Sequence, residues 1–140
     1  MQTVVNKTFD EIAPGDAASV VRTLQAGDLR AWAAVFGEGD TLAGSGESQA
    51  AAGIVTSMLT ALAGSALPGP GSSIRTASVQ IIGALPISMA MTARLVVREK
   101  RGDQGIVVLD GQCMDPSGQV VATAMLEVLA PTTRQQREIA

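Results

Sequence analysis

The hydrophobic positions of residues 49–66 recur at helical spacing and predict a long helix. Apolar side chains form two neighbouring stripes along this segment, and small side chains form a third. The apolar stripes are Ile54-Met58-Leu62 and Val55-Leu59-Ala63, and the small stripe is Gly53-Ser57-Ala61-Ser65. A helix that is apolar on one side and small on another is typical of a buried element whose backbone packs closely against its neighbours. We therefore expect this helix to lie at the centre of the core.

The pattern changes to alternation after the Pro-Gly-Pro-Gly segment of residues 68–71, which breaks the helix, and alternation predicts strands. The expected strands are residues 17–24, 78–82, 91–100, 105–114 and 119–129, the last two joined by a type I turn sequence at 115–118. A short helix carrying Leu29, Trp32 and Phe36 should end at Gly37. The elements predict an α+β fold in which an antiparallel sheet wraps around a long central helix, a hot-dog arrangement. Periodicity alone leaves other α+β arrangements open.

Composition and charge narrow the classes of function. The chain has 140 residues, 46% of them hydrophobic and 16% charged, which suits one folded domain. A formal net charge of −3 argues against nucleic acid as a partner, because binding to phosphates needs clustered Lys and Arg. A mean hydropathy of +0.28 with so few charges indicates that another protein surface covers one flank.

Histidine is absent and cysteine occurs once, at Cys113. The lack of His excludes a Ser-His-Asp triad, a His general base and a His-ligated zinc site, and we expect no metal. A single Cys excludes an internal disulfide. It favours a reducing compartment, and we expect the protein in the cytoplasm. We interpret Cys113 itself as a buried structural thiol. Carboxylates remain as acid–base groups, and Glu38 and Asp40 share one glycine-rich loop, although a solvated loop is the simpler interpretation of that pair.

The chain shows neither a phosphate-binding glycine motif nor the basic and apolar stretches of a signal peptide. The uncharged region that contains the long helix is interrupted by Thr, Ser, Pro and Gly, so we expect no membrane span. Residues 132–140 are polar. We therefore expect one domain over 1–131, followed by a polar tail or linker over 132–140.

The order of residues resembles the MaoC-like hot-dog domains. Residues 8–16, followed by residues 17–24, resemble the opening of that family, and Leu-Pro-Gly-Pro-Gly at 67–71 is the most distinctive string. The family includes the (R)-specific enoyl-CoA hydratases and hydratase-like domains fused to phosphate acetyl- or butyryltransferases. The resemblance, which covers residues 8–131, implies a homodimer or higher homo-oligomer and a possible fused or associated acyltransferase. It implies an acyl-CoA or another acyl-thioester as ligand, and no cofactor.

The resemblance also places a catalytic loop, in which the family carries an Asp and a His in the pattern G-D-x-N-P-x-H. On residues 37–43 of this chain, Glu38 stands at the Asp position, Asp40 at the Asn position and Ala43 at the His position. The His-Gly-Met sequence that usually opens the central helix reads Ala-Gly-Ile at 52–54. The resemblance implies that an acyl group would lie along the central helix. The implied binding residues are Gly53, Ile54, Val55, Thr56 and Ser57.

Two functions follow from this pattern. The missing dyad favours a weakly active or non-catalytic module that binds an acyl-thioester and dimerises. The alternative is an active enoyl-CoA hydratase that uses Glu38 and Asp40 in place of the dyad. A thioesterase-like hot-dog domain would keep a carboxylate on the central helix, and residues 49–66 contain none.

Overall fold

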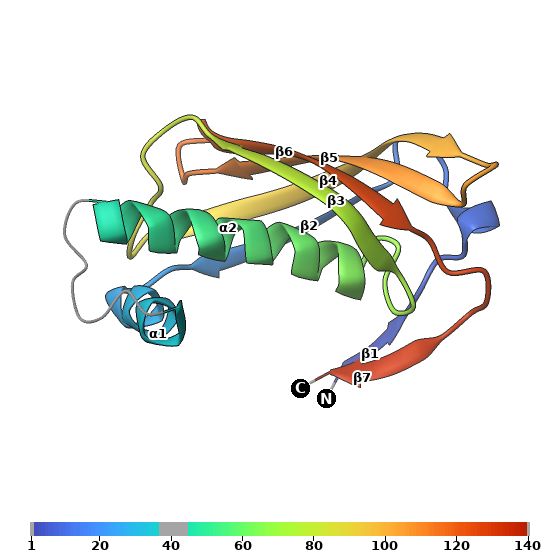
Figure 1. Ribbon diagram of the computed structural model, residues 1–140, viewed down its shortest axis with the longest axis horizontal. Helices are drawn as coiled ribbons and strands as arrows, with labels where there is room; N and C mark the ends of the chain where they lie inside the picture. Colours follow the sequence, from blue (N-terminus) through green and yellow to red (C-terminus); the bar gives the residue numbers. More distant parts are fainter. Residues whose placement is uncertain (1, 37–44, 140) are drawn as a thin grey trace.

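The computed structural model describes residues 2–36 and 45–139. Strands and helices follow the order expected of an α+β domain, with the long helix between the second and third strands (Figure 1). The elements are β1 (Gln2–Val5), the 3-10 turn η1 (Phe9–Glu11), β2 (Ala17–Thr23), α1 (Ala26–Phe36), α2 (Ser45–Ser65), β3 (Ser73–Ile81), β4 (Ala90–Arg101), β5 (Ile106–Met114), β6 (Val120–Leu129) and β7 (Gln136–Ile139).

The main sheet has five antiparallel strands in the order β2-β4-β5-β6-β3. The meander β4-β5-β6 forms its centre, and β2 and β3 are its two edges. The sheet curves over α2, which runs along its concave face, while α1 packs beside the first half of α2 (Figure 1). The structure therefore confirms the hot-dog arrangement of an antiparallel sheet around a central helix.

The core lies between α2 and the concave face of the sheet. On α2, Val55, Leu59 and Ala63 have no exposed surface, which confirms one of the apolar stripes as the buried face. On β4, every second residue from Met91 to Val97 is buried, as the alternation predicts. The apolar surface removed from water along these two elements is the main source of stability for the fold.

The turn at residues 115–118 has the predicted form. The Gly118 N–H donates to the Asp115 carbonyl at 3.0 Å, and the Asp115 carboxylate accepts from the N–H groups of Ser117 at 2.9 Å and Gln119 at 3.0 Å. These hydrogen bonds hold the pKa of Asp115 below its ordinary value, the contact with the Ser117 side chain being the largest cause. The turn fixes the register between β5 and β6.

Four elements differ from the sequence-based expectations. Helix α2 begins at Ser45 rather than 49, so Glu47 belongs to the central helix. Strand β3 begins at Ser73 rather than 78, because its first half pairs with β6 although its side chains do not alternate. The other two are the short strands β1 and β7, which pair with each other, so part of the segment expected as a polar tail or linker is a strand.

Asn6 holds the ribbon formed by β1 and β7 against the body of the domain. Asn6 is 2% exposed, and its Nδ2 donates to the carbonyls of Pro70 and Thr133, each at 2.9 Å. Its Oδ1 accepts from the Gln135 N–H, also at 2.9 Å. One amide thus connects the N-terminal segment, the loop after α2 and the C-terminal segment.

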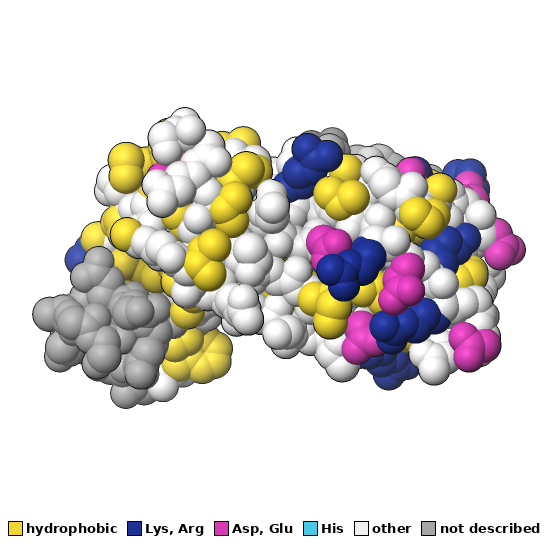
Figure 2. All heavy atoms as spheres, turned by 90° about the horizontal axis from the view of Figure 1, so that it is seen from above, with side chains coloured by type: hydrophobic (Ala, Val, Ile, Leu, Met, Phe, Trp, Pro, Cys, Tyr) yellow, Lys and Arg dark blue, Asp and Glu magenta, His cyan; other side chains and the backbone are white. Residues whose placement is uncertain are grey.

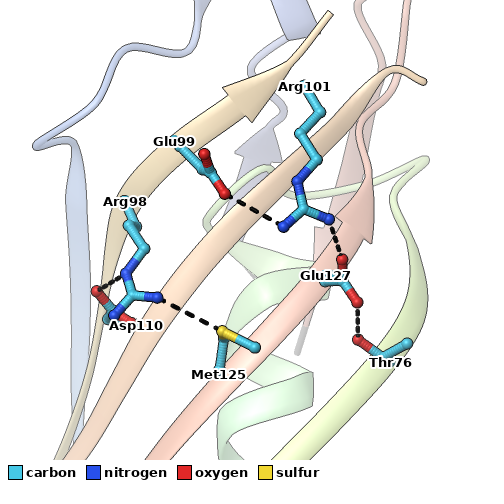
Figure 3. A network of polar contacts seen from close by, with 7 residues as sticks. All are labelled: Thr76, Arg98, Glu99, Arg101, Asp110, Met125 and Glu127. Carbon is cyan, nitrogen blue, oxygen red and sulfur yellow. Dashed lines mark hydrogen bonds and ion pairs between the residues drawn. The ribbon is translucent and has the colours of Figure 1, made fainter. Parts of the chain in front are cut away.

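The face of the sheet turned away from α2 divides into two regions. Charged side chains gather over one half, whereas hydrophobic side chains are more frequent over the other (Figure 2). A polar network crosses strands β3 to β6 and consists of Thr76, Arg98, Glu99, Arg101, Asp110, Met125 and Glu127 (Figure 3). Glu127 accepts from Thr76 Oγ1 at 2.6 Å and from Arg101, and these contacts lower its pKa. The network keeps this half of the face polar.

Neither α1 nor α2, the helices of residues 2–36 and 45–139, is long and apolar enough to cross a membrane.

Candidate functional site

A groove of about 460 Å³ lies between α2 and the edge strand β2, a size within the range of small-molecule sites. Strand β2 forms one wall, α2 forms the other, and Trp32 of α1 also contributes to the lining. The lining residues are Val20, Arg22, Trp32, Ile54, Ser57, Met58, Ala61, Leu62 and Ser65. Most of this surface is apolar, with two hydroxyls on α2 and one cation on β2. Such a surface suits an aliphatic group.

Close packing between α1 and α2 fixes the indole of Trp32. A Cβ placed on Gly53 would lie 2.6 Å from three atoms of the Trp32 ring, so only Gly allows this approach. The Trp32 and Phe36 rings are 4.7 Å apart and tilted by 38°. Gly53 is therefore needed for helix packing, and through that packing it positions the indole beside the groove.

The small residues of α2 have two different environments. Gly53 packs closely against a neighbour, as the sequence predicts, but Ser57 and Ala61 are exposed and line the groove. The expectation that the whole small stripe packs against neighbouring backbone is wrong for these two residues. Their small side chains leave the space that a bulkier stripe would fill.

The hydroxyls along this face bond to the helix backbone. Ser57 Oγ donates to the Gly53 carbonyl at 3.0 Å, and Thr56 Oγ1 donates to the Ala52 carbonyl at 2.9 Å. These bonds use the only proton of each hydroxyl, so the Ser57 oxygen presents lone pairs to the groove and accepts hydrogen bonds. The described lining contains no carboxylate or thiol.

The sequence-predicted site residues fall into three groups. Glu38, Asp40 and Ala43 lie outside the described residues. Ile54 and Ser57 line the groove, and Gly53 contacts the indole at its edge. Of the other two residues on α2, Val55 is fully buried against the sheet, and Thr56 is half-buried and absent from the lining.

Several lining residues were not selected by sequence reasoning. Val20 and Arg22 belong to a strand whose pattern predicts only alternation, and Trp32 was assigned to the helix spacing of α1. One signal was available: Arg22 occupies the same strand face as Val20, where a core-facing strand normally continues with an apolar residue. A cation at that position indicates that the inner face opens to solvent there.

Cys113 has no catalytic environment. It lies on β5 with no exposed surface, and burial raises the pKa of its thiol to about 11. A thiol with such a pKa is almost entirely protonated at neutral pH, and the thiolate is the reactive form. The interpretation of Cys113 as a structural thiol is confirmed.

No family model matches the chain, and no curated protein sequence matches it. Solved structures do match it. The R-hydratase PhaJ1 from Pseudomonas aeruginosa, in the unliganded form, is 20% identical with a TM-score of 0.83, covering 99% of this chain and 95% of that one.

Two further structures show the same similarity. The (R)-hydratase from A. caviae involved in PHA biosynthesis is 22% identical with a TM-score of 0.76, covering 86% of this chain and 98% of that one. The MaoC-like dehydratase from Rhodospirillum rubrum is 15% identical with a TM-score of 0.65, covering 90% and 97%. At such identities the similarity concerns the fold, and function has to be argued from the site. The chain thus has the hot-dog fold seen in (R)-hydratases and MaoC-like dehydratases, and the resemblance noted in the sequence is confirmed at that level.

Proposed function

We propose that this protein is a hydratase-like hot-dog domain that binds an acyl-thioester and has weak or no hydratase activity. The observation that carries the proposal is the apolar groove along α2, which contains Ile54 and Ser57 from the segment implicated by the resemblance. An acyl chain placed in this groove buries its methylenes against the apolar side chains of α2 and β2, each methylene contributing about 0.8 kcal/mol. The fold shared with (R)-hydratases supports the same ligand class.

The proposal of weak activity rests on the amino-acid composition. Hydration of an enoyl-thioester requires a water molecule that is oriented and deprotonated, and the chain has no His to do this. A positioned acid–base group is typically worth about 10²- to 10⁴-fold in rate. Hydration of crotonyl-CoA should therefore be at least about a hundredfold slower than in a relative that carries the Asp-His dyad.

A calorimetric titration with crotonyl-CoA and butyryl-CoA, run beside a hydration assay, tests both parts. Binding with turnover reduced at least a hundredfold supports the proposal. Turnover equal to that of a dyad-bearing hydratase overturns the statement on activity, and the absence of binding overturns the statement on the ligand.

The alternative is an active hydratase in which Glu38 and Asp40 replace the dyad. Glu38→Gln and Asp40→Asn separate the two, because both substitutions remove a carboxylate while keeping its size. A substantial turnover that falls in either variant would favour the alternative. A residual rate unchanged in both variants would favour the binding module.

A second copy of the chain is the expected partner. Strand β3 is an edge of the sheet, its residues are almost all exposed, and Ile74, Ile81 and Ile82 expose apolar side chains along or just beyond it. Pairing two β3 edges would satisfy the backbone groups of both strands and cover this surface. Light scattering at micromolar concentration should give the mass of a dimer or larger homo-oligomer, and a strictly monomeric mass would contradict this.

The remaining expectations are part of the same proposal. The sequence resemblance supports a fused or associated acyltransferase as a further partner. The free buried thiol of Cys113 is compatible with the cytoplasm.

A further inference from the structure

Arg22 occupies a position where the architecture of β2 calls for an apolar residue. Successive side chains of a strand point to opposite faces, so Ala18, Val20 and Arg22 share one face and Val21 points to the other. Ala18 and Val20 pack against the core on that shared face. Arg22 is the next residue in this row, and it lines the groove beside α2.

The guanidinium of Arg22 has donors to spare. Its Nη1 donates to the Val21 carbonyl at 2.9 Å, and within residues 2–36 and 45–139 no carboxylate forms an ion pair with it. Arg98 and Arg101, by contrast, each pair with a carboxylate of the outer sheet face. A guanidinium has five N–H donors in a planar fork that matches a carboxylate or a phosphate.

Apolar and cationic surface thus meet within one groove. Val20, Met58 and Leu62 provide an apolar wall, and Arg22 provides the positive charge. A neutral aliphatic molecule would satisfy only the apolar part. A ligand with an aliphatic chain and an anionic group would satisfy both.

We propose that Arg22 makes this groove selective for aliphatic molecules that carry an anionic group, which pairs with the guanidinium while the chain lies along α2. The inference rests on the proposed function, because it concerns the same groove, and it adds the residue that selects the ligand. The anion is a carboxylate or phosphate, supplied by a free fatty acid or by the CoA part of an acyl-thioester.

The fluorescence of Trp32 can be used to measure ligand binding in the groove. Trp32 is the single Trp of the chain and lines the groove, so its fluorescence reports on the occupation of this site. The probes are octanoate, octanoyl-CoA and 1-octanol, titrated by fluorescence with calorimetry in parallel. The variants are Arg22→Gln and the control Arg94→Gln, which removes an exposed arginine of β4 that does not line the groove.

The expected result is that at least one anionic probe binds more tightly than 1-octanol. Arg22→Gln should weaken that probe about three- to tenfold, because a charge-assisted pair at a solvent-exposed position is worth less than a buried one. It should leave the affinity for 1-octanol unchanged, and Arg94→Gln should change the affinity for neither kind of probe. If Arg22→Gln lowers the affinity for octanoate alone, the anionic group is a carboxylate. If it lowers the affinity for octanoyl-CoA alone, the anionic group is a phosphate of CoA.

Three results overturn the inference: equal affinities of wild type and Arg22→Gln for both anionic probes, equal weakening of 1-octanol by this substitution, or no binding of any probe. Its failure is distinct from that of the proposed function. If octanoyl-CoA binds without dependence on Arg22, the inference fails and the proposed function stands. If octanoate binds through Arg22 while CoA thioesters do not bind, the inference stands and the proposed function fails.

Discussion

The contact between Gly53 and Trp32 predicts opposite effects for one substitution made at two glycines of α2. In Gly53→Ala, the new Cβ would lie 2.6 Å from the indole, so the ring would have to move by about 0.8 Å to reach ordinary contact. In Gly64→Ala, the new Cβ meets nothing within 4 Å. The helix-propensity gain of up to about 1 kcal/mol is similar in both variants.

The difference between the two variants therefore measures the overpacking against Trp32. Inserting a methyl group into a packed contact typically costs about 1–3 kcal/mol. Gly64→Ala should raise the free energy of unfolding by up to about 1 kcal/mol, and Gly53→Ala should leave it unchanged or lower it by up to about 2 kcal/mol.

Urea denaturation at one fixed protein concentration measures both variants, since an oligomer would make stability depend on concentration. A third variant removes the overpacking against the indole. In a Trp32→Leu background, Gly53→Ala should no longer destabilise the protein, because the smaller Leu side chain leaves room for the new Cβ. A Gly53→Ala protein stabilised as much as Gly64→Ala would refute the close approach of the indole to α2. So would a Gly53→Ala effect that is the same with and without Trp32.

Three further predictions concern single residues. Asn6→Ala should lower the free energy of unfolding by about 2–3 kcal/mol, because two carbonyls and one N–H lose their hydrogen-bond partner. Urea denaturation measures this change, and a change below about 0.5 kcal/mol would contradict the anchoring role of Asn6. Glu127 has a pKa lowered below 4.5 by Thr76 and then Arg101, so its stabilisation is present above pH 4.5 and disappears as the pH falls through the folded-state pKa. The melting temperature of wild type should accordingly exceed that of Glu127→Gln at pH 7, and the difference should shrink as the pH falls below 4.5. A difference that stays constant over the whole acidic range in which the protein is folded would argue against this linkage. Cys113 should resist a thiol reagent at pH 8 in the folded protein, because only about 0.1% of its thiol is deprotonated there, and it should react fully in denaturant. Fast labelling of the folded protein would show that the thiol is accessible.

Elements with a strong period were predictable from the sequence. The stripe through Val55, Leu59 and Ala63 and the alternation of β4 each predict both the element and its buried face. The first half of β3 was missed because an edge strand exposed on both faces has no alternation to detect. The strands β1 and β7 are four residues each, and their existence depends on pairing between the two ends of the chain.

The residues of the groove could likewise be predicted from the sequence only in part. The sequence points to Ile54 and Ser57 on α2, whereas the contributions of Arg22 and Trp32 depend on how β2 and α1 pack beside that helix. No local pattern encodes that packing. The loop that carries Glu38 and Asp40 lies outside the described residues, so its role remains a prediction.

The pairing of β1 with β7 has a consequence for the order in which the chain folds. Gln2 pairs with Ile139, whereas β4, β5 and β6 are joined by short turns. During synthesis the hairpins of the meander can close as soon as their strands have emerged, but the ribbon has to wait for residues 136–139. The ribbon consists of two four-residue strands that are far apart in sequence, so it should be the last part to form and the first to open. Amide hydrogens of β1 and β7 should accordingly exchange with solvent faster than those of β5, long before the core itself unfolds.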